Sequence, residues 1–441
     1  MAPVSVEVGR SWGHYPAARH SRVIPVRRDE TPVLADLPEH VLPFGCGRSY
    51  GDSCLNDGGA LLLTTELDRV ISLDDDGLLR CEAGITLARI LEVVVPRGWF
   101  LPVVPGTRWV TVGGAIANDI HGKNHHRAGS FGVHVTRFEV LRSSGERVVC
   151  SRESNATMFA ATIGGLGLTG LILWAELRLQ RVPGPGIAEE RIRFGGLGEF
   201  LSLASEDAAH EHTVAWVDCL TRGRQLGRGV YFRGAHVAAR DIGRAPTAGP
   251  VISVPFEAPT GLLLNRVTLG AFNALKYRRE LVGPVRAVVP YESFFFPLDA
   301  IGRWNRLYGP SGFVQYQCVV PDGQSGGAVR AILERVSSSR ETPTLGVLKR
   351  FGAVASPGLL SFPRPGLTLA MDFPVRGTST LRLLDDLDRE VRGAGGAVYP
   401  AKDARMSGDS FRSYFPAWKT FATHVDPRFS SSFWRRVNDA A

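Results

Sequence analysis

Fifteen consecutive residues carry an unusual density of side chains that could do chemistry. The stretch 118–132 reads NDIHGKNHHRAGSFG and ends at Gly132. Its candidate functional side chains are those of Asp119, His121, Lys123, His125 and His126. Four interpretations are open: a metal site, a phosphate cradle, a catalytic loop beside a cofactor, or a polar surface loop. A metal site needs three or four convergent ligands. The three histidines could supply them, but no second cluster of acids or cysteines in the sequence supports this, so we expect no metal.

Three glycine-rich loops could close around phosphate groups. They read FGCGRSYGD at 44–52, PVVPGTRWVTVGGAIANDIHG at 102–122 and TIGGLGLTG at 162–170. Glycines let successive backbone N–H groups converge on an anion. The first loop lacks the following helix on which a dinucleotide-binding Rossmann loop places a pyrophosphate. Each loop alone is also compatible with an ordinary turn. Together they predict a large phosphate-bearing ligand whose backbone partners come from separate loops.

Polar side chains also interrupt apolar segments further along the chain. Gln315 and Gln317 alternate in FVQYQCVV, so in a strand both point to the same face. Buried amides need partners, which either a sugar with several hydroxyls or a buried structural network could supply. Lys349 in GVLKRFG stands between apolar residues, where a phosphate would satisfy its charge.

Short strands and helices must position these residues. From 41 to 179, β-rich runs alternate with turns, and SLDDDGLL and RSSGERVV are typical of hairpins. The segments 86–98 and 156–165 predict helices that end at proline or glycine. RVPGPG at 181–186 predicts a domain boundary, and the Pro/Gly-rich segment 245–261 predicts a loop or hinge. Beyond the boundary, HTVAWVDCL and GFVQYQCVVP indicate strands, whereas GGAVRAILERVSSS and TSTLRLLDDLDREVRGAG indicate helices. The pattern is α+β rather than a regular βαβ repeat.

The composition is that of a globular enzyme that favours anionic partners. The 441 residues make two domains the natural expectation, and the net charge is +8. Lysines and arginines do not gather into blocks, which argues against nucleic-acid binding. The six cysteines are scattered without a CxxC pair, so we expect reduced thiols. Neither an export signal nor an apolar span of about 20 residues is recognisable. We therefore expect a cytoplasmic or peripherally membrane-associated protein.

Five motifs, in order, resemble one known family. They are GRSYGD, PGTRWVTVGGAIANDIHGKNHHRAGSFG, GGLGLTG, QYQ and YPAKDAR, and the resemblance covers nearly the whole chain. The family is that of the decaprenylphosphoryl-β-D-ribose 2′-oxidases, flavoproteins with a vanillyl-alcohol-oxidase or PCMH-type FAD-binding fold. The resemblance implies an α+β protein of two domains. The FAD-binding domain would span 1–184, an inserted antiparallel-sheet substrate domain 185–396, and a C-terminal return to the FAD-binding domain 397–441.

The resemblance implies that the glycine-rich loops hold FAD noncovalently. Other flavoproteins of this fold often carry a histidine covalently linked to FAD in the first glycine loop, and the comparable position here is Tyr50. His121 and Lys123 would face the flavin and the substrate, and Lys402 would stabilise reduced flavin as a nearby cation. The implied cofactor-binding residues are Gly45, Gly47, Arg48, Ser49, Tyr50, Gly51, Pro105, Gly106, Thr107, Gly113, Gly114, Asn118, Asp119, His121, Gly122, Gly165, Gly170, Tyr399 and Lys402.

A substrate pocket over the flavin is also implied. Its residues would be Lys123, Trp216, Gln315, Gln317, Lys349 and Ala370. Many family members have a cysteine where this chain has Ala370, so inhibitors that act through that thiol should not attach covalently here. A base must take the proton of the reacting hydroxyl. His121, Tyr50 and Lys402 are the implied catalytic candidates, and the sequence does not rank them.

The implied reaction is oxidation of the 2′-hydroxyl of a polyprenylphosphoryl-β-D-ribose to the 2′-keto sugar. An NAD(P)H-dependent keto-sugar reductase would then complete the epimerisation to the arabinose donor for cell-wall synthesis, and a quinone or oxygen would reoxidise the flavin. The alternative is FAD-dependent oxidation of another sugar or nucleoside secondary alcohol in a specialised pathway. The segment 261–286 mixes leucines with arginines. It is either an amphipathic lip that meets a polyprenyl tail or an anionic membrane, or an ordinary helix packed on its own domain.

Overall fold

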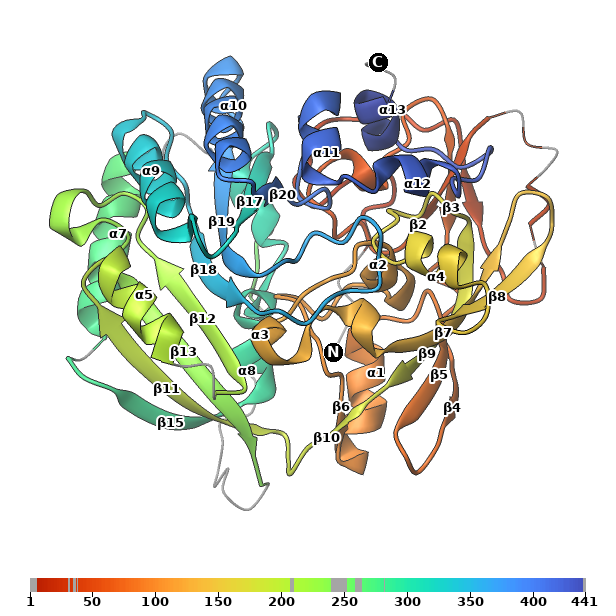
Figure 1. Ribbon diagram of the computed structural model, residues 1–441, viewed down its shortest axis with the longest axis horizontal. Coiled ribbons are helices and arrows are strands. Elements are labelled where there is room, and N and C mark those ends of the chain that lie inside the picture. The colour runs from red at the N-terminus through yellow and green to blue at the C-terminus, as the bar shows by residue number, and fades with distance from the viewer. Residues whose placement is uncertain are drawn as a thin grey trace.

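Two lobes meet along a central seam in the computed structural model (Figure 1). The structure describes residues 6–30, 32–34, 37, 39–206, 210–238, 252–257, 264–280 and 282–438. One lobe contains the N-terminal part of the chain, coloured red to yellow, together with the last helices in dark blue. The other lobe contains the middle of the chain, coloured green to light blue. The seam between them holds the site described below.

Small sheets form the first lobe. Among the described residues, three parallel strands lie in the order β1-β3-β2, and five antiparallel strands lie in the order β4-β5-β9-β7-β8. Both predicted hairpins are confirmed, since β4 pairs with β5 and β7 with β8. The strands are β1 (Val23–Pro25), β2 (Val41–Phe44), β3 (Ala60–Leu63), β4 (Val70–Leu73), β5 (Leu78–Glu82), β6 (Trp99–Phe100), β7 (Val135–Leu141), β8 (Arg147–Ser151), β9 (Leu171–Arg178) and β10 (Gln180–Arg181).

Short helices complete this lobe where the sequence signals begin and end them. The predicted helix at 86–98 is confirmed as α1 (Leu87–Val94), which starts where the Thr86 side chain accepts a hydrogen bond from the Arg89 N–H. It gives way to a short 3-10 turn and stops at Gly98, whose φ of +77° suits glycine. The predicted helix at 156–165 is confirmed as α4 (Ala156–Thr162). The remaining helices here are α2 (Val112–Ala117) and α3 (His125–Ala128).

A large antiparallel sheet forms the second lobe. In the described part of the chain its eight strands lie in the order β15-β11-β13-β12-β18-β19-β17-β20. The strand β17 is buried along its whole length, which explains its nearly continuous apolar sequence. The strands of this lobe are β11 (Gly186–Phe194), β12 (His212–Val217), β13 (Gly229–Val237), β14 (Ile252–Ser253), β15 (Val285–Pro290), β16 (Ile301–Gly302), β17 (Phe313–Val320), β18 (Gly346–Phe351), β19 (Gly366–Pro374) and β20 (Ala397–Val398).

Helices cover one face of this sheet and leave the other toward the seam. The helix α10 (Thr378–Gly393) buries Leu383, Leu387 and Val391 at helical spacing and packs on β17. Beside it lie α9 (Ser325–Ser338) and α5 (Leu197–Glu206) (Figure 1). The predicted helices of the second lobe are thus confirmed as α9 and α10. Further helices are α7 (Arg266–Arg279) and α8 (Tyr291–Phe295).

The end of the chain returns to the first lobe. After β20 has paired with β17, the chain forms α11 (Gly408–Tyr414), α12 (Trp418–Ala422) and α13 (Ser432–Asn438). The Ser430 N–H donates to the Val41 carbonyl and the Ser432 N–H to that of Leu55, which fastens this end to β2 and its following loop. The eight-stranded sheet therefore reaches Val398, and the division at 184 and 396 stays a prediction.

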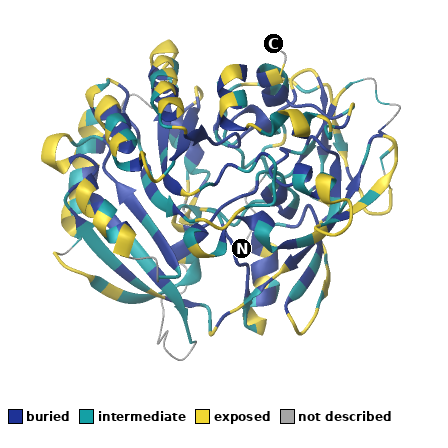
Figure 2. Ribbon diagram, in the orientation of Figure 1, coloured by how far each residue is buried: buried dark blue, intermediate teal, exposed yellow. Residues whose placement is uncertain are grey.

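Burial follows the layers. Figure 2 shows exposed residues along the outer helices and buried ones within the sheets and the seam. All six cysteines are free thiols, as expected. No helix within the described ranges is long and apolar enough to cross a bilayer. The segment 245–261 lies mostly outside the described residues, apart from β14 and the residues that follow it to 257.

Candidate active site

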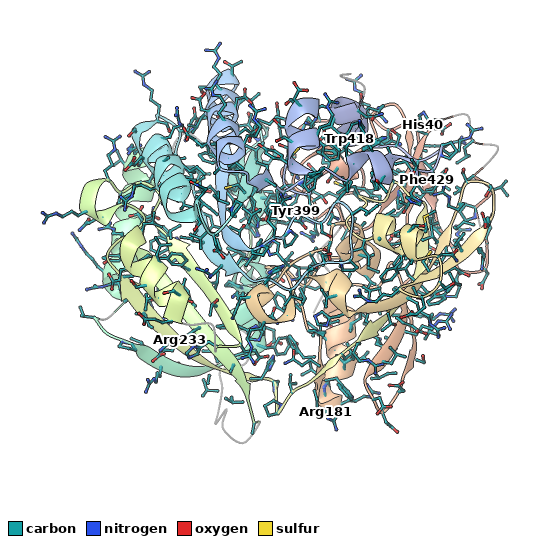
Figure 3. All side chains as sticks on the ribbon, viewed as in Figure 1. His40, Arg181, Arg233, Tyr399, Trp418 and Phe429 are labelled. Carbon is teal, nitrogen blue, oxygen red and sulfur yellow. The ribbon has the colours of Figure 1, made fainter. Side chains whose placement is uncertain are left out.

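A cavity of about 530 Å³ lies between the two lobes and takes its walls from both. The first lobe contributes the loops at 45–50 and 104–114 together with His121. The second lobe contributes inward-facing side chains of β17, β18 and β19. The segment 399–402 closes the cavity where the chain returns between the lobes, and Figure 3 labels Tyr399 at this central position.

Glycines shape the first-lobe wall where backbone must come close to a ligand or to another loop. A Cβ at Gly45 would lie 2.5 Å from Thr111 Oγ1, so only glycine lets these two loops touch. Thr111 is itself engaged, because its hydroxyl accepts a hydrogen bond of 3.2 Å from the Gly114 N–H at the start of α2. Gly106 faces open space, since a Cβ there would meet nothing within 4 Å. This wall therefore presents bare backbone to the cavity.

Buried donors without partners also line this wall. Within the described part of the chain, Arg48 Nε, Ser53 Oγ and Trp109 Nε1 are buried and make no hydrogen bond. The Arg48 guanidinium lies 4.2 Å from the centre of the Trp12 ring. Buried donors are normally satisfied, so three of them around one cavity indicate a ligand rich in acceptors. A dinucleotide with a pyrophosphate and polar ring edges has that chemistry, and these residues fit FAD.

His121 is the centre of a buried polar group at the second-lobe end. Its Nδ1 lies 3.1 Å from Lys349 Nζ and its Nε2 lies 2.8 Å from the Gln317 amide nitrogen. Burial, reinforced by the charge of Lys349, lowers the pKa of His121 well below its usual value, so the ring is neutral. A neutral imidazole has one acceptor nitrogen. If the Lys349 ammonium donates to Nδ1, the ring proton lies on Nε2 and the Gln317 amide must present its oxygen there.

Lys402 and Tyr50 form a second contact in the cavity wall. Lys402 Nζ lies 3.5 Å from the centre of the Tyr50 ring, a cation–π geometry. Burial lowers the pKa of Lys402 and raises that of Asp372, and the two groups oppose each other's shifts through their charges. Asp372 accepts a hydrogen bond from Gln315, its partner across the β17–β19 ladder. An ionisable pair with shifted pKa values at a cavity wall is typical of a catalytic site.

A third cationic group lies beneath α8. Lys123 Nζ donates to the Phe294 carbonyl and lies 4.4 Å from the centre of that ring. Burial lowers the pKa of Lys123 to about 8, and the charge of Glu189 acts against this. Trp216 faces the same space. Lys276 Nζ of α7 lies 4.3 Å from the centre of the Trp216 ring. Cations thus reach the cavity from several sides.

Most of the residues implied by the family resemblance line this cavity. All six implied substrate residues do so, as do the implied FAD residues with three exceptions. Gly51 packs against the Asp403 carbonyl, which a Cβ would approach to 1.7 Å, and Gly165 packs against the Ala161 carbonyl. Asp119 accepts hydrogen bonds from Ser356, Ser361 and the Gly132 N–H. These three positions support the loops that form the wall.

The histidines of the opening loop do not converge. His125 Nδ1 accepts from the Gly352 N–H at 3.3 Å, and His126 Nε2 lies 2.8 Å from the His210 carbonyl. His121 has the separate partners given above. The rings of His121 and His125 both contact Phe351, but the nitrogens of the three histidines have different partners and do not meet at one point. Of the interpretations open for this loop, the geometry favours a loop beside a cofactor and substrate cavity.

Some charged residues at the cavity were not anticipated from the sequence. Glu189 and Lys276 line the cavity, and Asp372 lies behind Gln315 in its wall. Asp372 had a usable signal, because an acid inside the apolar run TLAMDFP must have a buried partner. Lys276 and Glu189 had none, since their positions depend on how α7 and β11 pack on the sheet.

Comparisons with known proteins identify the cofactor-binding domain and the family. A family model described as an FAD binding domain matches residues 33–151. A decaprenylphosphoryl-β-D-ribose oxidase from Mycolicibacterium smegmatis is 36% identical over 414 residues, which cover 90% of this chain and 89% of that protein. A Streptomyces coelicolor protein, described as an uncharacterised protein in the mprA 5′ region, is 38% identical over 80% of this chain and 100% of its own length.

Fold, cavity and comparisons together define an FAD-dependent oxidoreductase with a PCMH-type FAD-binding domain. The α+β two-domain class expected from the sequence is confirmed. The chain belongs to the decaprenylphosphoryl-β-D-ribose oxidase family.

Proposed function

We propose that this protein oxidises the 2′-hydroxyl of a polyprenylphosphoryl-β-D-ribose to the 2′-keto sugar. One observation carries the proposal beyond the family: Lys123, Lys349 and Lys402 are all half-buried and line one cavity. Burial first, and then the charges of the other two lysines, lower the pKa of Lys349 to about 7. An anion beside Lys349 would stabilise the charged form of this lysine. The phosphate of the substrate would be that anion.

The amides of β17 are suited to a sugar. Gln315 and Gln317 point from the same face of β17 into the cavity, and each already has one hydrogen bond to a side chain of β19. An amide has further donor and acceptor capacity beyond such a bond. Both interpretations of the paired glutamines therefore apply together: a structural network holds the amides, and their remaining capacity would bind ribose hydroxyls.

Lys402 is our choice for the group that takes the hydroxyl proton. A base works best when its pKa lies near the operating pH. Burial lowers the pKa of Lys402 toward that range, whereas it raises the pKa of Tyr50 and lowers that of His121, moving both away from it. The proton would move from the substrate oxygen to Nζ, leaving a cation in the wall. Tyr50 would pack under Lys402, and His121 would hold Lys349 in place.

FAD would be held noncovalently by the first-lobe loops. When bound, FAD supplies the acceptor for the hydride that leaves the sugar carbon. Gly45, Gly106 and Gly114 would present backbone, while Arg48 and Trp109 would donate hydrogen bonds. Tyr50 has no nucleophilic nitrogen with which to form the histidyl link known in other flavoproteins of this fold. A quinone or oxygen would accept the electrons in turn.

The product chemistry implies a second enzyme. A 2′-keto sugar becomes the 2′-epimer when hydride is returned to the opposite face. An NAD(P)H-dependent keto-sugar reductase would do this, and the pair would make the arabinose donor for cell-wall synthesis.

The helix α7 is suited to meet the lipid part of such a substrate. Its outer face exposes Val267, Phe272 and Leu275, whose exposed fractions are 81%, 57% and 69%. Lys276 on the same helix reaches the cavity, so the exposed apolar face lies next to the cavity wall. The basic Arg278 and Arg279 follow and are exposed. Apolar and basic side chains on one helix are typical of contact with an anionic membrane. Residues 261–263 of the expected lip lie outside the described residues.

An anaerobic visible spectrum tests the proposal directly. The purified protein should be yellow, and its flavin band should bleach when a short-chain prenylphosphoryl ribose is added. If the flavin band persists with this substrate but bleaches with a free sugar or nucleoside, the lipid-linked substrate is wrong. The alternative, another secondary alcohol, would then be the substrate. Ala370 motivates this comparison, because it lines the cavity at the position where the family resemblance implies a cysteine in many members.

A further inference from the structure

A group of metal-ligand side chains lies outside the cavity, where the chain crosses from the first lobe to the second. Glu211 directly precedes β12, His212 begins it, and His236 lies in β13. Each offers one oxygen or nitrogen atom, and these atoms all lie within 4.8 Å of one another. No other group of three or more such side chains is found in the ranges that the structure describes.

The register of two strands brings the histidines together. His212 pairs with Gly234 across the β12–β13 ladder, and His236 is two residues further along β13. Directly paired residues, and residues two apart on one strand, share a face of a sheet. Both imidazoles therefore point the same way, with ring centres 5.9 Å apart. Glycine at 234 places no side chain between them.

His236 is oriented as a metal-binding histidine is. Its Nδ1 lies 3.1 Å from the Gly184 carbonyl oxygen, which can only accept a hydrogen bond. Nδ1 therefore carries the ring proton, and Nε2 presents its lone pair. This Nε2 is buried and makes no hydrogen bond with any described residue. A ligating histidine usually fixes its tautomer by such a bond from the other ring nitrogen.

His212 and Glu211 are spaced for a shared ion. His212 is 4% exposed, and its Nε2 lies 3.2 Å from Glu211 Oε1 without the angle that a hydrogen bond requires. Two ligand atoms in a tetrahedral zinc site are about 3.3 Å apart, because each lies about 2.0 Å from the ion. The Glu211 carboxylate is itself held, since the Gln180 side chain donates to Oε1 at 2.9 Å and the backbone N–H of His236 donates to Oε2 at 3.4 Å.

The surroundings keep these groups in their ligating forms. Burial lowers the pKa of both histidines, which favours neutral imidazole. The rings of Phe100 and Phe295 lie 4.7 Å and 4.8 Å from those of His236 and His212, respectively. They give the group an apolar shell on one side.

We propose that Glu211, His212 and His236 bind a divalent transition-metal ion of the zinc type, with water as the fourth ligand. Two imidazoles and one carboxylate are a known zinc ligand set. The residue that holds the Glu211 carboxylate indicates what the ion would do. Gln180 belongs to β10, which pairs with β6 of the first lobe, and Arg181 beside it marks this crossover in Figure 3. The ion would fasten the large sheet to the crossover strand.

Zinc binding to the holoenzyme tests the site. The protein is purified without a histidine tag, dialysed against a chelator with FAD retained, and titrated with Zn²⁺ in competition with a chromophoric chelator. We expect one equivalent to bind and the unfolding temperature to rise, because a ligand that binds only the folded state stabilises it. His236→Ala and Glu211→Gln should each weaken binding at least 10-fold. His424→Ala, a histidine far from the group, is the matched control and should bind as the wild type does.

Two results would overturn the site. One is a wild-type protein that takes up no zinc, and the other is a His236→Ala variant that binds zinc as tightly as the His424→Ala control. Flavin absorbance distinguishes loss of the site from loss of the fold, since a folded variant retains FAD. His236→Cys gives a positive control. A thiolate is also a zinc ligand, so this variant should bind the zinc that the alanine variant does not bind.

Discussion

Lys349 Nζ lies 3.1 Å from His121 Nδ1, and the half-buried lysine and the buried histidine both line the seam cavity. The histidine comes from the loop before α3 and the lysine from β18, so this contact joins the two lobes at the site. The ring is neutral and the lysine has no carboxylate partner among the ion pairs of the described residues. The arrangement orients a cation toward the cavity without neutralising it, as a phosphate-binding lysine requires.

Replacing Lys349 should therefore weaken substrate binding more than chemistry. Lys349→Ala removes a charge-assisted contact worth about 1.5–3 kcal/mol, so KM should rise roughly 10- to 150-fold. Steady-state kinetics with a prenylphosphoryl ribose measure this, and the flavin spectrum checks the fold. Lys419→Ala, on α12 and outside the cavity, is the control. A KM that is unchanged for the phosphorylated substrate would remove Lys349 from the phosphate site.

Replacing Lys402 should slow flavin reduction while FAD stays bound. Lys402→Ala removes the group we propose as the base, and general-base catalysis contributes about 100- to 10,000-fold. Anaerobic stopped-flow reduction separates this step from binding. Normal reduction by the alanine variant would exclude Lys402 as the base. Substrate saturation should still be reached, since the phosphate contact is assigned to a different lysine.

The two lysines predict a narrow optimum in the pH dependence of kcat/KM. Lys402 must be neutral to accept a proton, so activity rises with pH through its lowered pKa. Lys349 must be charged to bind phosphate, so activity falls as pH rises through its pKa of about 7. Lys349→Arg tests the assignment, because arginine stays protonated and should abolish the alkaline limb. An alkaline limb that survives in this variant would belong to another group.

Local signals in the sequence were sufficient to predict helices and hairpins, but not to predict which side chains contact each other inside the site. The turn in SLDDDGLL and the periodicity of α10 were recognised because both depend on neighbouring residues. Asp372 was missed as the partner of Gln315 because their contact depends on the register of β17 and β19, which lie far apart in sequence. The metal-ligand group was not predicted for the same reason, since only the β12–β13 register brings His236 close to His212.

The family motifs identified the cavity walls but not which residues face inward. Asp119 was inferred as an FAD residue because it lies in the contiguous block 106–132, yet its side chain accepts hydrogen bonds from two serines and does not line the cavity. Its buried carboxylate needs those donors, and the block holds no signal for them because Ser356 and Ser361 lie in a distant loop. The direction in which a loop side chain points is set by such partners, which lie far away in the sequence.

Noncovalent attachment of FAD can be checked on the wild-type protein. Acid precipitation should release all of the flavin into the supernatant, because Tyr50 offers no imidazole for a covalent link. Tyr50→Phe should behave in the same way and retain FAD when folded, since the ring keeps its edge contact with Phe313 at 5.4 Å. Flavin fluorescence remaining with the denatured wild-type chain would show a covalent bond and refute this prediction.

The exposed apolar face of α7 predicts binding to anionic membranes. Leu275 is 69% exposed beside two arginines, so Leu275→Asp adds a charge where insertion is proposed without disturbing a buried contact. Sedimentation with phosphatidylglycerol vesicles should show binding by the wild type and a loss of several-fold in this variant. Val149→Asp places the same charge on an exposed valine of β8 in the other lobe and is the matched control. If both variants bind vesicles like the wild type, α7 is an ordinary surface helix. If both lose binding equally, added negative charge alone explains the loss, and a specific α7 contact is excluded.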